Sequence, residues 1–375
     1  MNSDVKRKLN TILVTGGSGF IGSNFIRYLL GDTAQSEHGF TGRIINLDAL
    51  TYAGNPENLA DIAANAGDRY RFVHGDITDA NLFKNLFSEE PIDTIVHFAA
   101  ESHVDRSIHG PQAFIQTNIM GTFTLLEAAR NAWNAPGALN IRDDVLFHHV
   151  STDEVYGTLG ATGYFTEGTP YDPRSPYSAS KASSDHLVRA YHHTYGLPIT
   201  LSNCSNNYGP YQFPEKLIPV MILNILENRP LPVYGDGKNI RDWLYVEDHN
   251  RAVWTVMTRG AAGVSYNIGG NNEWENLRLV ETLCDLVAEE LGRNQEQTRG
   301  LISFVKDRPG HDRRYAIDCS RIQKELGWRQ SVDFKEGLRK TVAWYLNNQE
   351  WINQVRTGAY LDWIETNYGT RKIKI

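Results

Sequence analysis

The chain has 375 residues, with 37 lysines and arginines against 44 aspartates and glutamates, and a formal net charge of −7 at pH 7. These charges are spread along the chain and leave no basic face that would hold nucleic acid by its phosphates. The three cysteines are far apart, which argues against a disulfide framework or a zinc ribbon. No apolar run could span a bilayer or resembles a signal peptide, so we expect a cytoplasmic protein without a membrane partner.

Short runs rich in β-branched and aromatic residues recur along the chain, with helical patterns between most of them. Each run is nearly continuous in apolar residues, which is typical of strands buried on both faces of a parallel sheet. Alternation of such strands with helices predicts an α/β fold with a doubly wound parallel Rossmann sheet. The expected strands are 11–15, 43–48, 70–74, 93–98, 145–150, 199–204 and 265–268.

The segment 16–22 reads Gly-Gly-Ser-Gly-Phe-Ile-Gly and lies between the first expected strand and an apolar helix that starts near Gly19. Its glycines permit a tight turn and close approach of backbone amides to a pyrophosphate at the helix N-terminus. Asp48 ends the second strand, where its carboxylate would accept hydrogen bonds from a ribose and repel a 2′-phosphate. The pattern predicts a dinucleotide site that prefers NAD to NADP.

Two further strand ends belong to the same predicted cleft, because ligands bind outside the carboxyl ends of strands in open α/β sheets. Asp76 and Ile77 follow the third strand, and the segment 98–102 follows the fourth. For Asp76 we weigh an adenine contact equally against a role as the N-cap of the following helix.

Two helical patterns, 111–132 and 177–195, each carry an apolar stripe. Packing of both stripes against the sheet is the simpler interpretation. A seam between helices of two copies of the chain is the alternative.

The segment 151–157, Ser-Thr-Asp-Glu-Val-Tyr-Gly, follows the fifth strand and should emerge at the same sheet edge. Thr152 is placed to hydrogen-bond a reacting hydroxyl. A carboxylic acid and a carboxylate such as Asp153 and Glu154 can remove a proton from one carbon and protonate a hydroxyl leaving the next, which is β-elimination of water. A strand-end turn with solvated acids is the alternative. Histidines 148–149 precede this segment, but they alternate between sheet faces, so we expect no metal site.

Tyr177 and Lys181 are spaced four residues apart, so on a helix they share a face. A lysine ammonium and a positive nicotinamide ring both favour tyrosinate, and we expect them to lower the phenol pKa toward a range useful for a general base. The pair is what a nicotinamide enzyme needs to take a proton from an alcohol while hydride leaves its carbon.

After about residue 206 the chain becomes rich in loops containing Pro, Gly, Tyr and Asn, which usually surround a site. We expect an NAD-binding domain over 1–205, with returning segments near 240–270, and a smaller, mostly helical domain over 206–375 that binds a nucleotide sugar. Helices are expected at 277–291, 320–326 and 334–347.

Six motifs together resemble the dTDP-glucose 4,6-dehydratases, a group of extended short-chain dehydrogenases/reductases. The similarity covers the chain from residue 11 onward, and the adjacent acids separate this group from related epimerases and decarboxylases. The motifs are the glycine loop 16–22, Ser-Thr-Asp-Glu-Val-Tyr-Gly at 151–157, Tyr-Ser-Ala-Ser-Lys at 177–181, Asn-Cys-Ser-Asn-Asn-Tyr-Gly-Pro-Tyr at 203–211, Arg-Asp-Trp-Leu-Tyr-Val-Glu-Asp-His at 241–249 and Arg-Pro-Gly-His-Asp-Arg-Arg-Tyr at 308–315.

The resemblance implies dehydration of dTDP-glucose to its 4-keto-6-deoxy product by transient oxidation at C4, loss of water across C5–C6 and return of hydride to C6. By this resemblance, Tyr177 would take the proton from O4 while Thr152 orients the hydroxyl, and Lys181 would hold the nicotinamide ribose. Glu154 would be the base and Asp153 the acid of the elimination. A homodimer through the helices near 111–132 and 177–195 is implied as well.

The resemblance also implies two sets of binding residues. Arg241 would pair with the substrate diphosphate, although a surface ion pair with Asp242 or Glu247 is the alternative, and Tyr234 would stack on the base. The cofactor residues would be Gly16, Gly19, Phe20, Ile21, Gly22, Asp48, Thr51, Asp76, Ile77, Phe98, Ala99, Ala100, Ser102, Thr117, Tyr177, Lys181 and Asn207. The substrate residues would be Ser102, Thr152, Asn206, Lys216, Leu217, Pro232, Val233, Tyr234, Arg241, Asn276, Asp307, Arg308 and His311.

Three other functions remain open from the sequence. A UDP-glucose 4,6-dehydratase would differ in recognising a base that lacks one methyl group, worth about 0.8 kcal/mol when buried. A nucleotide-sugar epimerase or decarboxylase would share the cofactor site without needing both acids. A non-catalytic NAD-binding regulator would use the fold alone.

Overall fold

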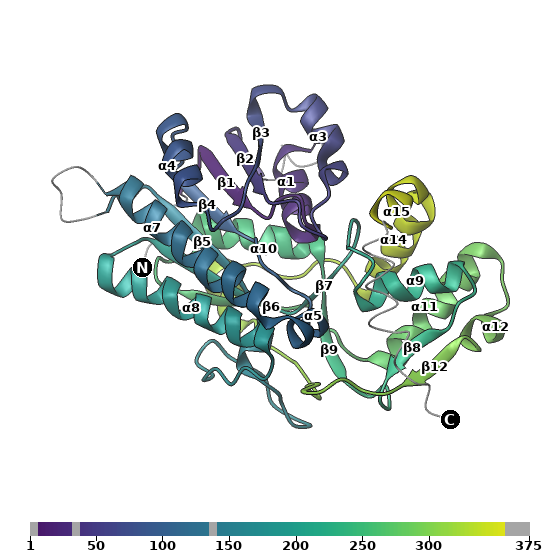
Figure 1. The fold of residues 1–375 in the computed structure, drawn as a ribbon. Helices are drawn as coiled ribbons and strands as arrows, with labels where there is room; N and C mark the ends of the chain where they lie inside the picture. The colour runs from purple at the N-terminus through teal and green to yellow at the C-terminus, as the bar shows by residue number, and fades with distance from the viewer. Residues whose placement is uncertain (1–6, 32–37, 135–140, 357–375) are drawn as a thin grey trace.

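The structure is a computed structural model that describes residues 7–31, 38–134 and 141–356. A parallel sheet of seven strands forms its centre, in the order β10-β6-β5-β4-β1-β2-β3 (Figure 1). The strands are β1 (Thr11–Thr15), β2 (Arg43–Asp48), β3 (Tyr70–His74), β4 (Thr94–His97), β5 (Leu146–Thr152), β6 (Ile199–Cys204) and β10 (Ser265–Ile268). The doubly wound Rossmann sheet is thereby confirmed.

Helices cover both faces of this sheet because successive strand residues point to opposite sides. Ile12 and Val14 of β1 pack on one side, whereas Leu13 packs on the other. The first face is covered by α1 (Phe20–Leu30), α10 (Val246–Arg259) and α13 (Ser320–Leu326); the second by α4 (Ala80–Glu89), α7 (Thr122–Trp133) and α8 (Pro176–Tyr195).

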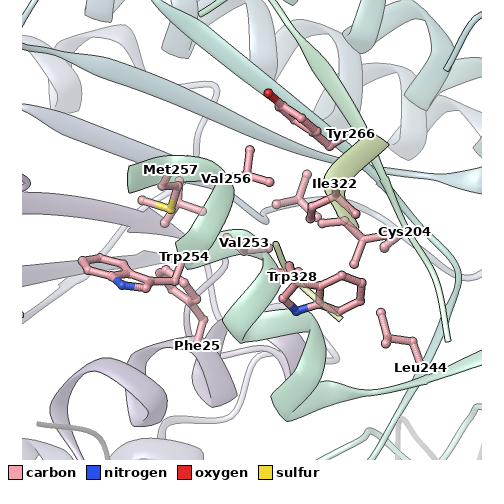
Figure 2. Close-up of a cluster of buried hydrophobic side chains, with 14 of the residues drawn as sticks. Phe25, Cys204, Leu244, Val253, Trp254, Val256, Met257, Tyr266, Ile322 and Trp328 are labelled. Atoms are coloured by element: carbon pink, nitrogen blue, oxygen red, sulfur yellow. The ribbon is translucent and has the colours of Figure 1, made fainter. Parts of the chain in front are cut away.

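Side chains of α10 fill the first face (Figure 2). Trp254 lies near Phe25 of α1, and Val253 and Val256 lie between α1 and the segment around Ile322. Burial of such aromatic and branched side chains contributes about 1.5–3 kcal/mol each. This core joins a late part of the chain, α13, to the early strands of the sheet.

The helix expected at 111–132 contains an irregular turn. It consists of α6 (Pro111–Phe114), a π-helix (Ile115–Gly121) and α7, following α5 (Val104–His109). Asn118 lies inside the π-helix, where its amide donates to the hydroxyl of Ser180 at 2.8 Å and to the carbonyl of Glu101 at 3.0 Å. These buried hydrogen bonds draw the turn inward, as is common for π-helical turns near functional sites.

Two strands differ from their expected bounds: β4 covers Thr94–His97 instead of 93–98, and β5 covers Leu146–Thr152 instead of 145–150. β5 continues through Thr152 instead of ending at Val150, because Ser151 and Thr152 still pair with Asn203 and Cys204 of β6. The next residues, Asp153–Tyr156, form a 3-10 turn. The site segment is therefore anchored in the sheet and is less loop-like than its composition indicates.

The C-terminal part holds its expected helices and also short strands that the sequence pattern did not predict. Its own apolar core gathers around Phe334, Leu338 and Trp243. The helices are α9 (Leu217–Leu226), α11 (Asn276–Leu291), α12 (Gln295–Arg299), α14 (Phe334–Asn347) and α15 (Gln349–Val355), and the strands are β7 (Asn206–Tyr208), β8 (Leu231–Tyr234), β9 (Ile240–Tyr245), β11 (Glu273–Glu275) and β12 (Ile302–Val305). These strands have only three to six residues, and prolines and glycines flank them.

Asp248 of α10 ties the segment before α14 to the sheet. Its buried carboxylate accepts hydrogen bonds from the backbone amides of Ser331 and Val332, both at 2.9 Å. We expect Asp248→Ala to lower the free energy of unfolding by about 3 kcal/mol, because these donors lose their partner. Urea unfolding measures this change. Glu290→Ala, at an exposed position on α11, is the control, and equal stability of the two variants would contradict the assignment.

Candidate active site

A cavity of about 310 Å³ lies at the carboxyl ends of β1, β4, β5 and β6. This is where the strand order reverses between β1 and β4, the position at which doubly wound sheets bind their ligands. The structure brings every expected cofactor residue to the wall of this cavity: Gly16, Gly19, Phe20, Ile21, Gly22, Asp48, Thr51, Asp76, Ile77, Phe98, Ala99, Ala100, Ser102, Thr117, Tyr177, Lys181 and Asn207.

The glycine loop is shaped for a phosphate. Gly16 has φ +72°, and a Cβ there would lie 2.6 Å from the backbone nitrogen of Ala99. Gly19 precedes α1 as its N-cap without a side-chain cap, and a Cβ there would meet only the Gly16 carbonyl, at 3.4 Å. The first amides of α1 therefore border an open space, where a pyrophosphate would accept their hydrogen bonds.

Asp48, which we expect to bind a ribose, also holds the loops on either side of it by hydrogen bonds. One carboxylate oxygen accepts from the Ser18 amide at 2.9 Å and the other from the Leu50 amide at 2.8 Å. Burial raises the pKa of Asp48, and these two hydrogen bonds oppose the increase. Each oxygen retains a lone pair, so the group still fits a ribose hydroxyl while it holds the loops on either side.

Asp76 is not the N-cap of the following helix. That position belongs to Asp79, which accepts from the amides of Asn81 and Leu82. Asp76 instead accepts from the amide and the hydroxyl of Thr78, both at 2.8 Å and both on the same oxygen. Asp76 lines the cavity, which leaves the adenine contact as the remaining hypothesis.

Tyr177 and Lys181 project from the first turns of α8, which begins with a capping box at Ser175. Both side chains are buried, and the Lys181 ammonium donates to the Val150 carbonyl at 2.9 Å. Burial raises the pKa of Tyr177 well above its usual value, the charge of Glu154 adds to the increase, and the Thr152 hydroxyl opposes it. Burial is the dominant effect in the protein alone, and the expectation that Lys181 and a nicotinamide ring together lower this pKa stays a prediction.

Asp153 and Glu154 are not solvated turn residues. Thr152 caps their turn, accepting from the Glu154 amide at 3.3 Å and donating to Asp153 Oδ1 at 3.4 Å. Asp153 is only 2% exposed, and its Oδ2 has no hydrogen-bond partner among the described residues. Glu154 is partly open to the cavity. Both residues thus line the cavity together with Tyr177.

The two acids have different electrostatic surroundings. Burial raises the pKa of Asp153 well above its usual value, and the negative charges of Glu154 and Asp242 raise it further. Burial raises the pKa of Glu154 as well, but Arg308, Arg241 and Lys216 all oppose that increase. Asp153 is thereby favoured as the protonated acid and Glu154 as the carboxylate.

The three cations that oppose the raised pKa of Glu154 come from distant segments. Arg241 is 5% exposed, donates to the carbonyls of Ile240 and Asp312 at 2.7 and 2.9 Å, and lies 4.2 Å from the ring centre of Tyr315. No carboxylate lies within ion-pair distance of it in the described part of the chain. The surface ion pair weighed for Arg241 is therefore wrong, and its buried charge suits a bound anion.

The other two cations are held by neighbouring groups. Lys216 donates to the Ser102 carbonyl at 2.8 Å, and Arg308 contacts Asp105 at 3.3 Å. The Nε of Arg308 is buried and has no hydrogen-bond partner within the described ranges. Charge-assisted bonds from such donors are strong when an acceptor arrives.

The expected substrate residues fall into two groups. Ser102, Thr152, Asn206 and Lys216 line the cavity. The rest lie outside its lining, on β8, at the starts of α9 and α11, on β9 and on the 307–311 loop: Leu217, Pro232, Val233, Tyr234, Arg241, Asn276, Asp307, Arg308 and His311.

Within the second group several side chains are in contact. Tyr234 donates to Asp105 at 3.1 Å and its ring lies 6.1 Å from that of His311, which is 2.6 Å from Asp307. Val233 is buried in the C-terminal core, so only its backbone is available to a ligand.

Sequence reasoning missed several residues of the site. Glu101, Cys204 and Glu215 line the cavity, and Tyr315 supports Arg241. Glu101 stands at a strand end between two expected residues, a position that could have identified it. Glu215 and Tyr315 reach the site only through the tertiary fold, and their sequence surroundings carry no comparable signal.

Comparison with known proteins decides the family. The family described as GDP-mannose 4,6 dehydratase matches residues 13–341. dTDP-glucose 4,6-dehydratase 1 of Escherichia coli (strain K12) is 55% identical over 370 residues, which are 96% of this chain and 99% of that protein. The chain belongs to the dTDP-glucose 4,6-dehydratase family.

Solved structures agree with this family. A dTDP-glucose 4,6-dehydratase of Streptomyces venezuelae with NAD bound is 46% identical, with a TM-score of 0.82 over 92% of this chain and all of that one. UDP-glucose 4-epimerase of Thermotoga maritima, with UDP-glucose, is 28% identical, with a TM-score of 0.75 over 90% of this chain and 99% of that one. The fold is shared with epimerases, whereas the higher identity is to the dehydratase family.

The burial of Asp153 has a measurable effect on stability. The pKa of Asp153 is higher in the folded protein than in the unfolded protein, where it is about 4. As pH rises above about 4, the carboxyl group therefore ionises more readily in the unfolded protein, and the free energy of unfolding falls. We therefore expect Asp153→Asn to stabilise the protein relative to wild type, by more at pH 7 than at pH 5. Urea unfolding at both values measures this, with exposed Asp68→Asn as the control. A difference independent of pH would show that Asp153 is not a buried neutral acid.

Proposed function

We propose that this protein dehydrates dTDP-glucose to dTDP-4-keto-6-deoxyglucose with NAD as a tightly held cofactor. The observation that carries the proposal is that the two carboxyl groups at the end of β5 have different electrostatic surroundings. Burial and negative charges raise the pKa of Asp153, whereas three cations oppose the rise in the pKa of Glu154. Both residues line one cavity with Tyr177. An alcohol oxidation alone would not require such a pair. Membership of the dehydratase family supports the same reaction.

The cavity fits a dinucleotide. The glycine loop leaves room for a pyrophosphate, Asp48 would accept from the adenosine ribose, and Lys181 would hold the nicotinamide ribose. When bound, NAD supplies the hydride acceptor for the sugar C4 and the hydride donor for C6. The carboxylate of Asp48 favours NAD over NADP because it repels a 2′-phosphate.

The protein residues move protons in two stages. Tyr177 takes the proton from O4 as C4 becomes a ketone, with Thr152 orienting the hydroxyl. The ketone acidifies the C5 proton because the resulting carbanion is an enolate. Glu154 then removes that proton, and Asp153 protonates the C6 hydroxyl, which leaves as water.

The protons taken up and released by the protein residues balance over the reaction. Hydride returned to C6 is matched by a proton delivered to C5 from Glu154, which restores that carboxylate. Tyr177 retains the O4 proton and Asp153 has lost one, so a proton passes between them through solvent before the next turnover. Substrate loses one molecule of water, without net oxidation.

The C-terminal half, within the domain proposed over 206–375, would bind the nucleotide. Arg241, which is buried, and Arg308, whose side chain is 17% exposed, would hold the diphosphate with their positive charges. Tyr234 would stack on the base, with Asn276 and His311 completing the pocket. The domain proposed over 1–205, with segments near 240–270, would hold the cofactor.

We also propose a homodimer formed through α7 and α8. These helices lie side by side on the outer face of the sheet (Figure 1). Large apolar side chains are exposed on and next to them: Ile108, Ile115, Met120, Phe123 and Tyr195. Exposed apolar side chains gathered on adjoining helices are typical of a protein interface.

We propose that the protein is cytoplasmic. All three cysteines are buried and unpaired, which suits a reducing compartment. Within the described residues no helix has the length and apolar character needed to cross a membrane.

Single-turnover chemistry tests the assigned roles. We expect wild-type protein to convert dTDP-glucose to a product lighter by one water. Asp153→Ala and Glu154→Ala should slow this loss at least about 100-fold, because each removes a proton-transfer group, yet should still form a sugar lighter by two hydrogens. Quenched samples are analysed by mass spectrometry, with Glu290→Ala as the control.

Parallel incubation with UDP-glucose and GDP-mannose distinguishes the substrates. Equal or faster turnover of UDP-glucose would replace the dTDP-glucose assignment. Epimerised product without loss of water would favour the epimerase alternative. Full turnover in either acid variant would refute the assigned roles.

Phe123→Glu tests the interface. Phe123 is 39% exposed on α7, and Phe304, on the distant β12, is 36% exposed. We expect sedimentation to give a dimer for wild type and for Phe304→Glu, but a monomer for Phe123→Glu, because a charge would be buried at the seam. A wild-type monomer would contradict the proposal.

A further inference from the structure

Behind Lys181 lies a buried group that the mechanism above does not use. Asp185 follows Lys181 by one turn of α8, so the two side chains leave the same face of the helix. Both reach β5 at consecutive residues: the ammonium contacts the Val150 carbonyl at 2.9 Å, and the Asp185 carboxylate accepts from the Ser151 hydroxyl at 2.8 Å.

Asp185 is fully buried and held on several sides. Its Oδ2 also accepts from the Tyr171 hydroxyl at 2.9 Å, and its Oδ1 lies 3.1 Å from His149 Nε2. Arg189 acts only indirectly, by donating to the Tyr171 hydroxyl at 3.0 Å. Such an arrangement fixes the position of the carboxylate and stabilises its ionised form.

The pKa values of Asp185 and its neighbours indicate which of these groups are charged near pH 7. Burial lowers the pKa of His149 to about 4, so its ring is neutral near pH 7. Burial alone would raise the pKa of Asp185, but His149, Lys181 and Ser151 outweigh it and lower the pKa. Burial lowers the pKa of Lys181, whereas Asp185 and then Cys204 oppose the change.

The other titratable groups near Lys181 do not supply a fixed negative charge. Burial raises the pKa of the Cys204 thiol, on β6, to about 12. His97, on β4, has its ring centre 5.3 Å from that of His149, and burial lowers its pKa well below the usual value. The phenol of Tyr177 is the group on which Lys181 is proposed to act. Asp185 is therefore the carboxylate positioned to balance the buried ammonium.

We propose that Asp185, held by hydrogen bonds from Ser151 and Tyr171 and lying against His149, is a positioning residue that keeps Lys181 charged during C4 oxidation. This inference rests on the proposed function, in which Tyr177 takes the O4 proton, and on the expectation from the sequence that the Lys181 ammonium favours the tyrosinate form of Tyr177. The carboxylate acts through the lysine and touches neither the substrate nor the cofactor. A buried ammonium without it would release its proton at lower pH, and the assistance to Tyr177 would end there.

The pH dependence of single-turnover oxidation tests this role. In Asp185→Asn, which has nearly the same shape but no charge, the alkaline limb of the rate profile should move down by about one pH unit. Asp185→Glu, which keeps the charge, should leave that limb in place even if the protein is less stable. Ser151→Ala removes one hydrogen bond but no charge, and should also leave it in place.

The outcomes separate the two proposals. Wild-type protein that does not consume dTDP-glucose would overturn the proposed function. Active wild type with an Asp185→Asn profile that superimposes on it, or with all three variants shifted alike, would overturn the role of Asp185 alone.

A measurement on the wild-type chain covers the case in which Asp185→Asn does not fold. Isotope-labelled lysine in the NAD-loaded protein allows the Lys181 ammonium to be titrated by NMR, with Lys181→Arg for assignment. We expect it to keep its proton at every pH at which the wild-type oxidation rate is constant. Loss of the proton within that pH range would overturn the inference.

Discussion

The structure depends on holding two neighbouring carboxyl groups away from bulk water at the end of β5. Asp153 and Glu154 would repel each other if both were ionised in such a place. The fold resolves this by surrounding them differently, with Asp242 and the sheet around Asp153 and cations around Glu154. The extra residues of β5, paired with β6 up to Thr152, fix the direction in which each acid leaves the strand.

Assembly of this site requires both parts of the molecule. The sheet supplies the glycine loop, the acid pair and α8, whereas Arg241 and Arg308 come from strands and loops later in the chain. Core packing of α10 and α13 on the face opposite α8 joins these parts (Figure 2). Correct charge on Glu154 therefore depends on contacts among segments that are far apart in sequence.

Much of the fold and cofactor site could be predicted from the sequence, because local patterns determine them. Seven apolar runs marked the central strands, and the glycine loop and Asp48 marked the strand ends that form the cavity. The short strands β7, β8, β9, β11 and β12 were missed because prolines and glycines hide their alternation. The burial of Tyr177 and the charge of Glu154 beside it are tertiary properties, so the raised pKa of Tyr177 in the protein alone could not be predicted from the sequence. The roles of individual site residues remain predictions.

The π-helix at Ile115–Gly121 allows one stretch of chain to serve two environments. It places Thr117 at the cavity and Asn118 in contact with Ser180, while Ile115 and Met120 face outward. Each residue of a regular helix advances by about 100°, so removing one residue here would restore regular winding and rotate one of these sets away from its neighbours. A shortened version of this segment could keep its inward contacts or its outward apolar surface, but not both.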